Sequence, residues 1–126
     1  MGNKAVVVLV VEDMQMWQDI WREHLEAMGV SAEMVGACTI EEARRLFTER
    51  QSDIDIILMD ACVPGDYPNT HGLVAEFRRS FGGPMVAISS LPEYRAEIVA
   101  AGCDREADGK HKVPHLVRDL VVELTT

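Results

Sequence analysis

The sequence has no apolar segment long enough to cross a membrane. A membrane-spanning helix needs about 20 consecutive apolar residues, whereas the apolar run near the N-terminus covers only 5–11. Lys4 precedes that run, and the longer apolar region and small-residue cleavage site of a secretory signal are missing. We therefore expect a cytoplasmic protein that makes no membrane contact.

Basic residues and cysteines are both scarce. The chain has 12 lysines and arginines against 21 aspartates and glutamates, which gives a formal net charge of −9. Because nucleic-acid binding needs a basic surface, this charge argues against direct nucleic-acid binding by the chain. The three cysteines, Cys38, Cys62 and Cys103, cannot all pair and show no metal-ligand spacing. They indicate free thiols in a reducing compartment.

The sequence does contain enough apolar residues for one folded domain. Its 126 residues are 48% hydrophobic, which suits a core that needs no disulfides. Continuous apolar runs, typical of strands buried on both faces, alternate with segments whose apolar residues have helical spacing. The expected strands are 5–11, 31–38, 54–59 and 85–88, followed by a polar last strand within 103–112.

Helices are expected between these strands, over 14–28, 39–47, 73–81, 92–101 and 114–124. Thr39 and Glu42 have the spacing of a capping box. Pro92 and Pro114 stand where helices would begin. The strict alternation of about five strands and five helices predicts an α/β fold, a doubly wound parallel sheet with right-handed crossovers.

Polar residues follow three of the expected strands. Glu12 and Asp13 follow the first strand, Asp60 follows the third, and Ser89 and Ser90 follow the fourth. In a doubly wound sheet the ligand lies beyond the carboxyl ends of the strands, at a switch in strand order. If the order is 2-1-3-4-5, the first and third strands are neighbours. The three acids then converge, and the serines lie just beyond them.

Converging carboxylates repel one another unless a cation neutralises them. Mg²⁺ prefers one or two carboxylates together with water and phosphate oxygens. The Ser89 hydroxyl would donate to a phosphoryl oxygen, and a lysine from the end of the fifth strand would balance its charge. We interpret the cluster as a phosphoryl-transfer site in which Asp60 is the nucleophile. Taken singly, each residue also fits a plainer role as a helix cap, a turn residue or a solvated side chain.

The segments VVVLVVED, IDIILMDACVPG and MVAISS, with the K-x-x-x-P pattern of KHKVP, make a more specific argument. With them the chain resembles the receiver domain of two-component response regulators over residues 1–126. The resemblance implies a flavodoxin-like three-layer sandwich with a five-stranded sheet in the order 2-1-3-4-5. It also implies Mg²⁺ (or Mn²⁺) as cofactor and aspartyl phosphate as the signalling state. Such a domain is not a conventional enzyme, because it catalyses only its own phosphorylation and dephosphorylation.

The resemblance also assigns roles to individual residues. Asp60 would accept the phosphoryl group from a sensor histidine kinase or a histidine phosphotransfer protein. The metal ligands would be Asp13, Asp60, the Cys62 backbone carbonyl and, through water, Glu12. The residues that bind the phosphoryl group and respond to it would be Ser89, Ser90 and Lys110.

The last strand and the lysine depart from the family pattern. Lys110 stands four residues before Pro114, as in many relatives, but the interval from Gly102 is one residue longer than usual. Lys112 therefore remains an alternative to Lys110. The position of the family's switch aromatic holds Ala107, so we expect activation without a rotating ring.

The loop from Asp60 to Gly72 is longer than the family norm by about four residues. It contains Asp66, Tyr67 and His71, and it is either a tolerated surface loop or a partner-specific lid over the site. An alternative function also stays open: a receiver-fold protein-interaction module that phosphorylation does not regulate. A flavin-binding protein and a haloacid-type hydrolase fit less well. The first would need a Gly/Ser/Thr-rich phosphate loop, and the second an aspartate where Cys62 stands.

Overall fold

The computed structural model describes residues 5–64 and 67–126. Its five strands form one parallel sheet in the order β2-β1-β3-β4-β5, which confirms the predicted fold and strand order. The strands are β1 (Val6–Val11), β2 (Ala32–Ala37), β3 (Ile54–Met59), β4 (Met85–Ala87) and β5 (Arg105–Glu106). The helices are α1 (Gln15–Ala27), α2 (Ile40–Arg50), α3 (His71–Arg78), α4 (Pro92–Ala101) and α5 (Val113–Thr125), preceded by a 3₁₀ turn, η1 (Lys110–Lys112).

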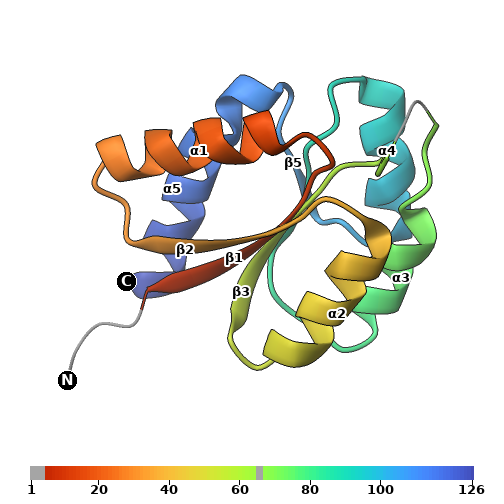
Figure 1. Ribbon diagram of the computed structural model, residues 1–126, viewed down its shortest axis with the longest axis horizontal. Helices are drawn as coiled ribbons and strands as arrows, with labels where there is room; N and C mark the ends of the chain where they lie inside the picture. Colours follow the sequence, from red (N-terminus) through yellow and green to blue (C-terminus); the bar gives the residue numbers. More distant parts are fainter. Residues whose placement is uncertain (1–4, 65–66) are drawn as a thin grey trace.

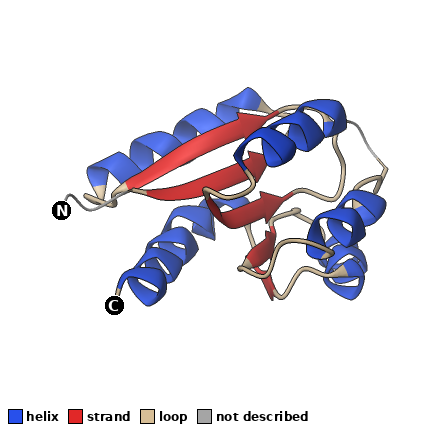
Figure 2. Cartoon of the chain, turned by 90° about the horizontal axis from the view of Figure 1, so that it is seen from below, coloured by secondary structure: helices blue, strands red, loops and turns tan. Residues whose placement is uncertain are grey.

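The helices cover both faces of the sheet, so the molecule has three layers (Figures 1 and 2). Alternate residues of β1 point to opposite faces, because side chains in a strand have a period of two. Val8 and Val10 join the core under α1 and α5, which also contains Trp21. Leu9 and Val11 join the core under α2, α3 and α4. This double coverage explains why β1 is apolar at every position.

Local signals explain several helix ends. The Thr39 hydroxyl accepts a hydrogen bond from the Glu42 amide at 3.0 Å, and the Glu42 carboxylate accepts one from the Cys38 amide at 2.8 Å. The predicted capping box therefore forms with one difference: the Glu42 carboxylate binds the amide of Cys38, the residue before the cap, and not the amide of the cap residue Thr39. Gly29, just after α1, has a φ of +72°, a conformation that favours glycine.

Two elements are shorter than their sequence patterns indicated. Helix α3 ends at Arg78 and not at Phe81, although Phe81 is still buried and packs edge-on against the Phe47 ring. Strand β5, at one edge of the sheet, has only two residues of the polar segment 103–112. None of the helices in the described part of the chain has the length and apolar character needed to span a bilayer.

Candidate functional site

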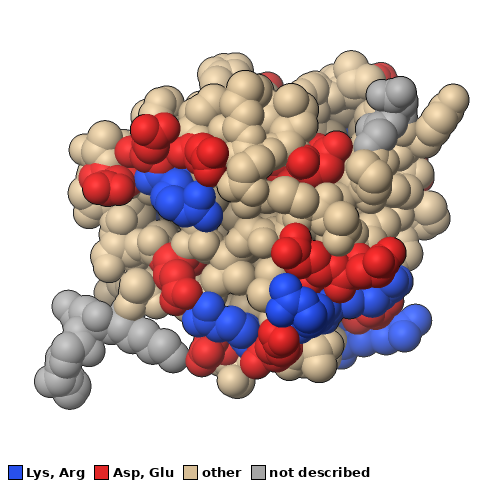
Figure 3. Space-filling view, in the orientation of Figure 1, with Lys and Arg blue, Asp and Glu red and all other residues tan. Residues whose placement is uncertain are grey.

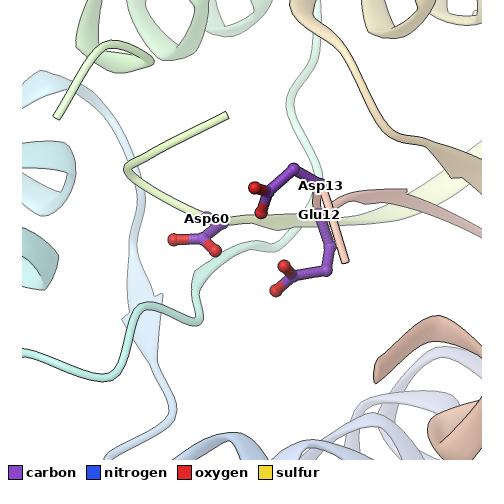
Figure 4. A group of neighbouring side chains, drawn as sticks. All are labelled: Glu12, Asp13 and Asp60. Carbon is purple, nitrogen blue, oxygen red and sulfur yellow. The ribbon is translucent and has the colours of Figure 1, made fainter. Parts of the chain in front are cut away.

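Three carboxylates meet at the carboxyl edge of the sheet. Strands β1 and β3 are neighbours, and Val11 pairs with Met59, so the residues that follow them lie side by side. Glu12, Asp13 and Asp60 each place a carboxylate oxygen within 4.8 Å of the other two (Figure 4). The convergence predicted from the strand order is therefore present.

Burial makes this cluster electrostatically unusual. Glu12 is 0% exposed and Asp60 is 6% exposed, whereas Asp13 is half-buried. The pKa of Glu12 is raised to about 7, chiefly by burial and in part by the neighbouring Asp60 charge, while the hydrogen bond and charge of Lys110 oppose the shift. The buried carboxylates thus repel one another and are poorly solvated. A hard divalent cation bound between them would reduce both costs.

Lys110 lies inside the cluster. Its Nζ is 2.6 Å from Glu12 Oε1 and 3.0 Å from Asp60 Oδ2. Burial alone would lower the pKa of Lys110, but its hydrogen bonds and charge interactions with the two acids raise it. Lys112, the alternative, is more than half exposed and pairs with Asp108. The structure therefore brings Lys110 to Asp60 and leaves Lys112 at the surface.

Two tryptophans of α1 position Lys110. The Trp21 indole N–H donates to the Lys110 backbone carbonyl at 2.9 Å. The Lys110 Nζ lies 5.9 Å from the centre of the Trp17 ring, within cation–π range, and the two indoles are stacked. The sequence indicated these tryptophans only as core residues. Trp21 is fully buried, and both also act on the site lysine.

Ser89 is the hydroxyl that reaches the cluster. Its Oγ donates to Asp60 Oδ1 at 2.7 Å and accepts from the Ala61 amide at 2.6 Å. Ser90 is exposed, and its backbone carbonyl accepts from Arg95 at 3.2 Å. Cys62 is buried, and its amide donates to Asp60 Oδ1 at 3.3 Å. Ala107 directly follows β5 and is buried in the core under α1 and α5.

The loop after Asp60 is hydrogen-bonded to the site through its last residues. The Thr70 hydroxyl is buried and donates to the Asp60 backbone carbonyl at 2.7 Å. The Asn69 side chain exchanges two 2.8 Å hydrogen bonds with the backbone of Val63. Tyr67 is strongly exposed, and Asp66 lies outside the described residues.

Gln18 is a further residue that sequence reasoning missed. Its side-chain amide donates to the Glu12 carbonyl at 2.8 Å, and it packs where a side chain at Gly36 would overlap with it. A signal was present, because Gln18 is a polar residue on the same helix face as Trp21 and Leu25. The sequence could not, however, identify the Glu12 carbonyl as the group that Gln18 binds.

An open cavity of about 270 Å³ lies beside Asp60, Ser89 and Lys110. Its lining consists of Asp60, Cys62, Ser89, Ser90, Leu91, Tyr94 and Lys110. This space is next to the Asp60 carboxylate and is large enough for a phosphoryl group. The arrangement thus offers a nucleophilic carboxylate, a hydroxyl donor and a cation facing one space.

Several solved structures of similar shape are response regulators or their receiver domains. The receiver domain of the Francisella response regulator 1452 is 20% identical, with a TM-score of 0.74, over 95% of this chain and 99% of that chain. A receiver domain protein from Methanospirillum hungatei is 17% identical, with a TM-score of 0.70, over 95% and 96%. A phosphorylated cyanobacterial phytochrome response regulator is 17% identical, with a TM-score of 0.73, over 98% of both chains.

These similarities show that the chain has the fold of response regulator receiver domains. No protein-family model and no curated protein sequence matches it. At these identities the comparison concerns the fold, and the chemistry rests on the residues at the carboxyl edge of the sheet.

Proposed function

We propose that this chain is a phosphoacceptor domain of two-component or phosphorelay signalling, in which Asp60 takes a phosphoryl group from a phosphohistidine. The observation that carries the proposal is the convergence on Asp60 of two further acids, the Ser89 hydroxyl and the Lys110 ammonium. A helix cap or a solvated acid needs none of these partners. A phosphoryl-accepting carboxylate needs all of them.

In the transfer step a carboxylate oxygen of Asp60 attacks phosphorus while the bond from phosphorus to the donor nitrogen breaks. The electron pair of that bond goes to the imidazole, which takes up a proton, and Asp60 becomes an acyl phosphate. The Ser89 hydroxyl, which donates a hydrogen bond to Asp60 Oδ1 in the structure, would donate to a phosphoryl oxygen after the transfer. Lys110 would keep its charge beside the new group.

The donor set fits a hard divalent cation. Asp13 and Asp60 would hold Mg²⁺ or Mn²⁺ with the Cys62 carbonyl, and Glu12 would contribute through water. The bound ion would supply positive charge that neutralises the phosphoryl oxygens. Glu12 and Lys110 would adjust the charge of the site around it.

The partner we propose is a sensor histidine kinase or a histidine phosphotransfer protein. Direct contact with nucleic acid is not part of the proposal. On the face drawn in Figure 3, lysines and arginines lie in small groups beside acidic side chains and form no continuous basic surface. Arg44 and Arg45, for example, pair with Glu76 and Glu49.

One observation favours a second candidate, a receiver-fold interaction module that phosphorylation does not regulate. Lys110 contacts both buried carboxylates and so neutralises part of the cluster without a metal ion. In such a module the cluster would be a structural ion-pair network. The two candidates differ in whether the protein takes up a phosphoryl group.

Intact-mass measurement after incubation with phosphoramidate and MgCl₂ tests the proposal. The wild-type protein should gain the mass of one phosphoryl group, and Asp60→Asn should gain none. Asp119→Asn, the same change at an exposed position on α5, should label as the wild type does. Equal labelling of Asp60→Asn would remove Asp60 from the role. An unlabelled wild-type protein would favour the interaction module.

A further inference from the structure

Arg95 is a buried cation that the phosphoryl chemistry does not use directly. It lies on α4, is 6% exposed and shares its helix face with the buried Ile98. A buried guanidinium is costly unless hydrogen bonds satisfy it. The contacts that satisfy Arg95 therefore show which part of the structure it holds.

The partners of Arg95 belong to the site. Its Nη1 donates to the backbone carbonyl of Ser89 at 2.9 Å and to that of Ser90 at 3.2 Å. Its Nε donates to Glu106 Oε1, on the edge strand β5, at 2.8 Å. One side chain thus connects α4, β5 and the segment that carries the Ser89 hydroxyl.

The Ser89 hydroxyl needs such support. Strand β4 ends at Ala87, and the Ile88 amide makes the last link to β3, with the Met59 carbonyl. Ser89 lies beyond that link, yet its Oγ must accept from the Ala61 amide and donate to Asp60 at the same time. A small shift of the Ser89 backbone would break one of these bonds.

We propose that Arg95 is a positioning residue for phosphoryl transfer at Asp60: anchored by Glu106, it fixes the Ser89 and Ser90 carbonyls and so aims the Ser89 hydroxyl. This inference rests on the proposed function. Arg95 touches neither Asp60 nor the phosphoryl group, and all of its effect passes through Ser89. Its loss should therefore slow phosphoryl transfer without removing any reacting group.

Arg78 is a matched control. Its guanidinium donates to the carbonyls of Phe81, Gly83 and Gly102 and pairs with Asp104. These partners lie near the amino ends of β4 and β5, away from Asp60. Arg78→Gln thus removes a comparable set of carbonyl contacts at the other end of the sheet.

The first measurement is the rate of phosphoramidate labelling with saturating MgCl₂, below the melting temperature of each variant. Arg95→Gln should label about tenfold more slowly than wild type, because misplacing a site group by a fraction of an ångström has effects of this order. Arg95→Lys, which keeps the charge and a donor, should recover part of the rate. Arg78→Gln should label at the wild-type rate even if its melting temperature falls.

The second measurement separates positioning from a general loss of structure. In a Ser89→Ala background, Arg95→Gln should cause little further slowing, because the group that Arg95 positions is already missing. An equal fold-loss in both backgrounds would overturn the inference, as would equal rates for Arg95→Gln and Arg78→Gln. Should Arg95→Gln fail to fold, Arg95→Lys and Glu106→Ala carry the same comparison. If wild type labels normally, these results bear on Arg95 alone; an unlabelled wild type would overturn the proposed function and this inference with it.

Discussion

The two ends of the sheet use their acids in opposite ways. Near the amino ends of the strands, Asp55 accepts from the Val7 amide at 2.9 Å and Asp104 from the Met85 amide at 2.8 Å. Each of these carboxylates satisfies a backbone amide at the edge of the hydrogen-bonded ladder. At the carboxyl end, Glu12 and Asp60 also accept from nearby amides, those of Met14 and Cys62, but in addition their carboxylates share the Lys110 ammonium.

At the carboxyl end, side-chain donors also hold several of the backbone carbonyls that follow the strands. Gln18 donates to the Glu12 carbonyl, Thr70 to the Asp60 carbonyl and Arg95 to the Ser89 carbonyl. The acids at this end lie close enough to repel one another. The acids of the amino end thus serve backbone amides, whereas Glu12 and Asp60 converge on one ammonium, as the proposed function requires.

Removing Lys110 should have the largest effect on stability. Breaking a buried ion pair leaves an uncompensated charge, so Lys110→Ala should lower the free energy of unfolding by about 3 kcal/mol in EDTA. Excess MgCl₂ should restore part of the loss by replacing the positive charge. Lys112→Ala, at an exposed side chain, should change almost nothing in urea unfolding at pH 7.5. The reverse pattern would show that Lys112 is the site lysine.

Glu12 should make stability fall as pH rises in the absence of metal. Its folded-state pKa of about 7 lies above the usual 4.5, so its contribution to stability is complete at low pH. That contribution is lost between pH 4.5 and 7, and amounts to on the order of 3 kcal/mol. Urea unfolding of wild type and Glu12→Gln in EDTA checks this. Parallel pH profiles for the two proteins would contradict the assignment.

Asp55→Ala should show the contrasting behaviour of the amino end. It leaves the Val7 amide without its carboxylate partner, which should cost about 1–3 kcal/mol of unfolding free energy. Because no metal site is involved, the loss should be the same with EDTA and with MgCl₂. A loss that MgCl₂ reverses would erase the distinction between the two ends.

Gly36→Ala should have the smallest effect of the four. A methyl group there overlaps with the Gln18 side chain, so the amide must move away from the Glu12 carbonyl. We expect a loss of about 1 kcal/mol together with weaker Mg²⁺ binding, measured by thermal melting and calorimetric titration. Gly72→Ala, where a methyl group meets open space, is the control and should leave Mg²⁺ binding unchanged.

The strands and the site acids could be predicted because their signals are local. Continuous apolar runs mark β1 and β3, and parallel strands bring the residues that follow them to one edge. Strand β5 gave little signal because an edge strand of two residues needs no apolar pattern. The predicted third helix extended to Phe81 because a buried aromatic continues the apolar pattern, whereas the backbone turns after Arg78.

The donors that hold the strand-end carbonyls could not be paired from the sequence. Thr70 and Asp60 are ten residues apart and are joined through a loop, and Arg95 reaches back to Ser89 from the second turn of a helix. Such pairs depend on the folded path of the chain. Gln18 and Arg95, polar residues on otherwise buried helix faces, were the available indications.

Thermal melting with and without Mg²⁺ tests the central claim, that the carboxyl-end acids form a metal and phosphoryl site. At pH 7.5 and matched ionic strength, free Mg²⁺ at about 100 times its Kd should add roughly 2.7 kcal/mol. That should raise the wild-type Tm by on the order of 10 °C relative to EDTA. Asp13→Asn and Asp60→Asn should melt higher than wild type in EDTA and respond less to Mg²⁺. An unchanged wild-type Tm at saturating Mg²⁺ would contradict the account, because the three carboxylates would then form no metal site.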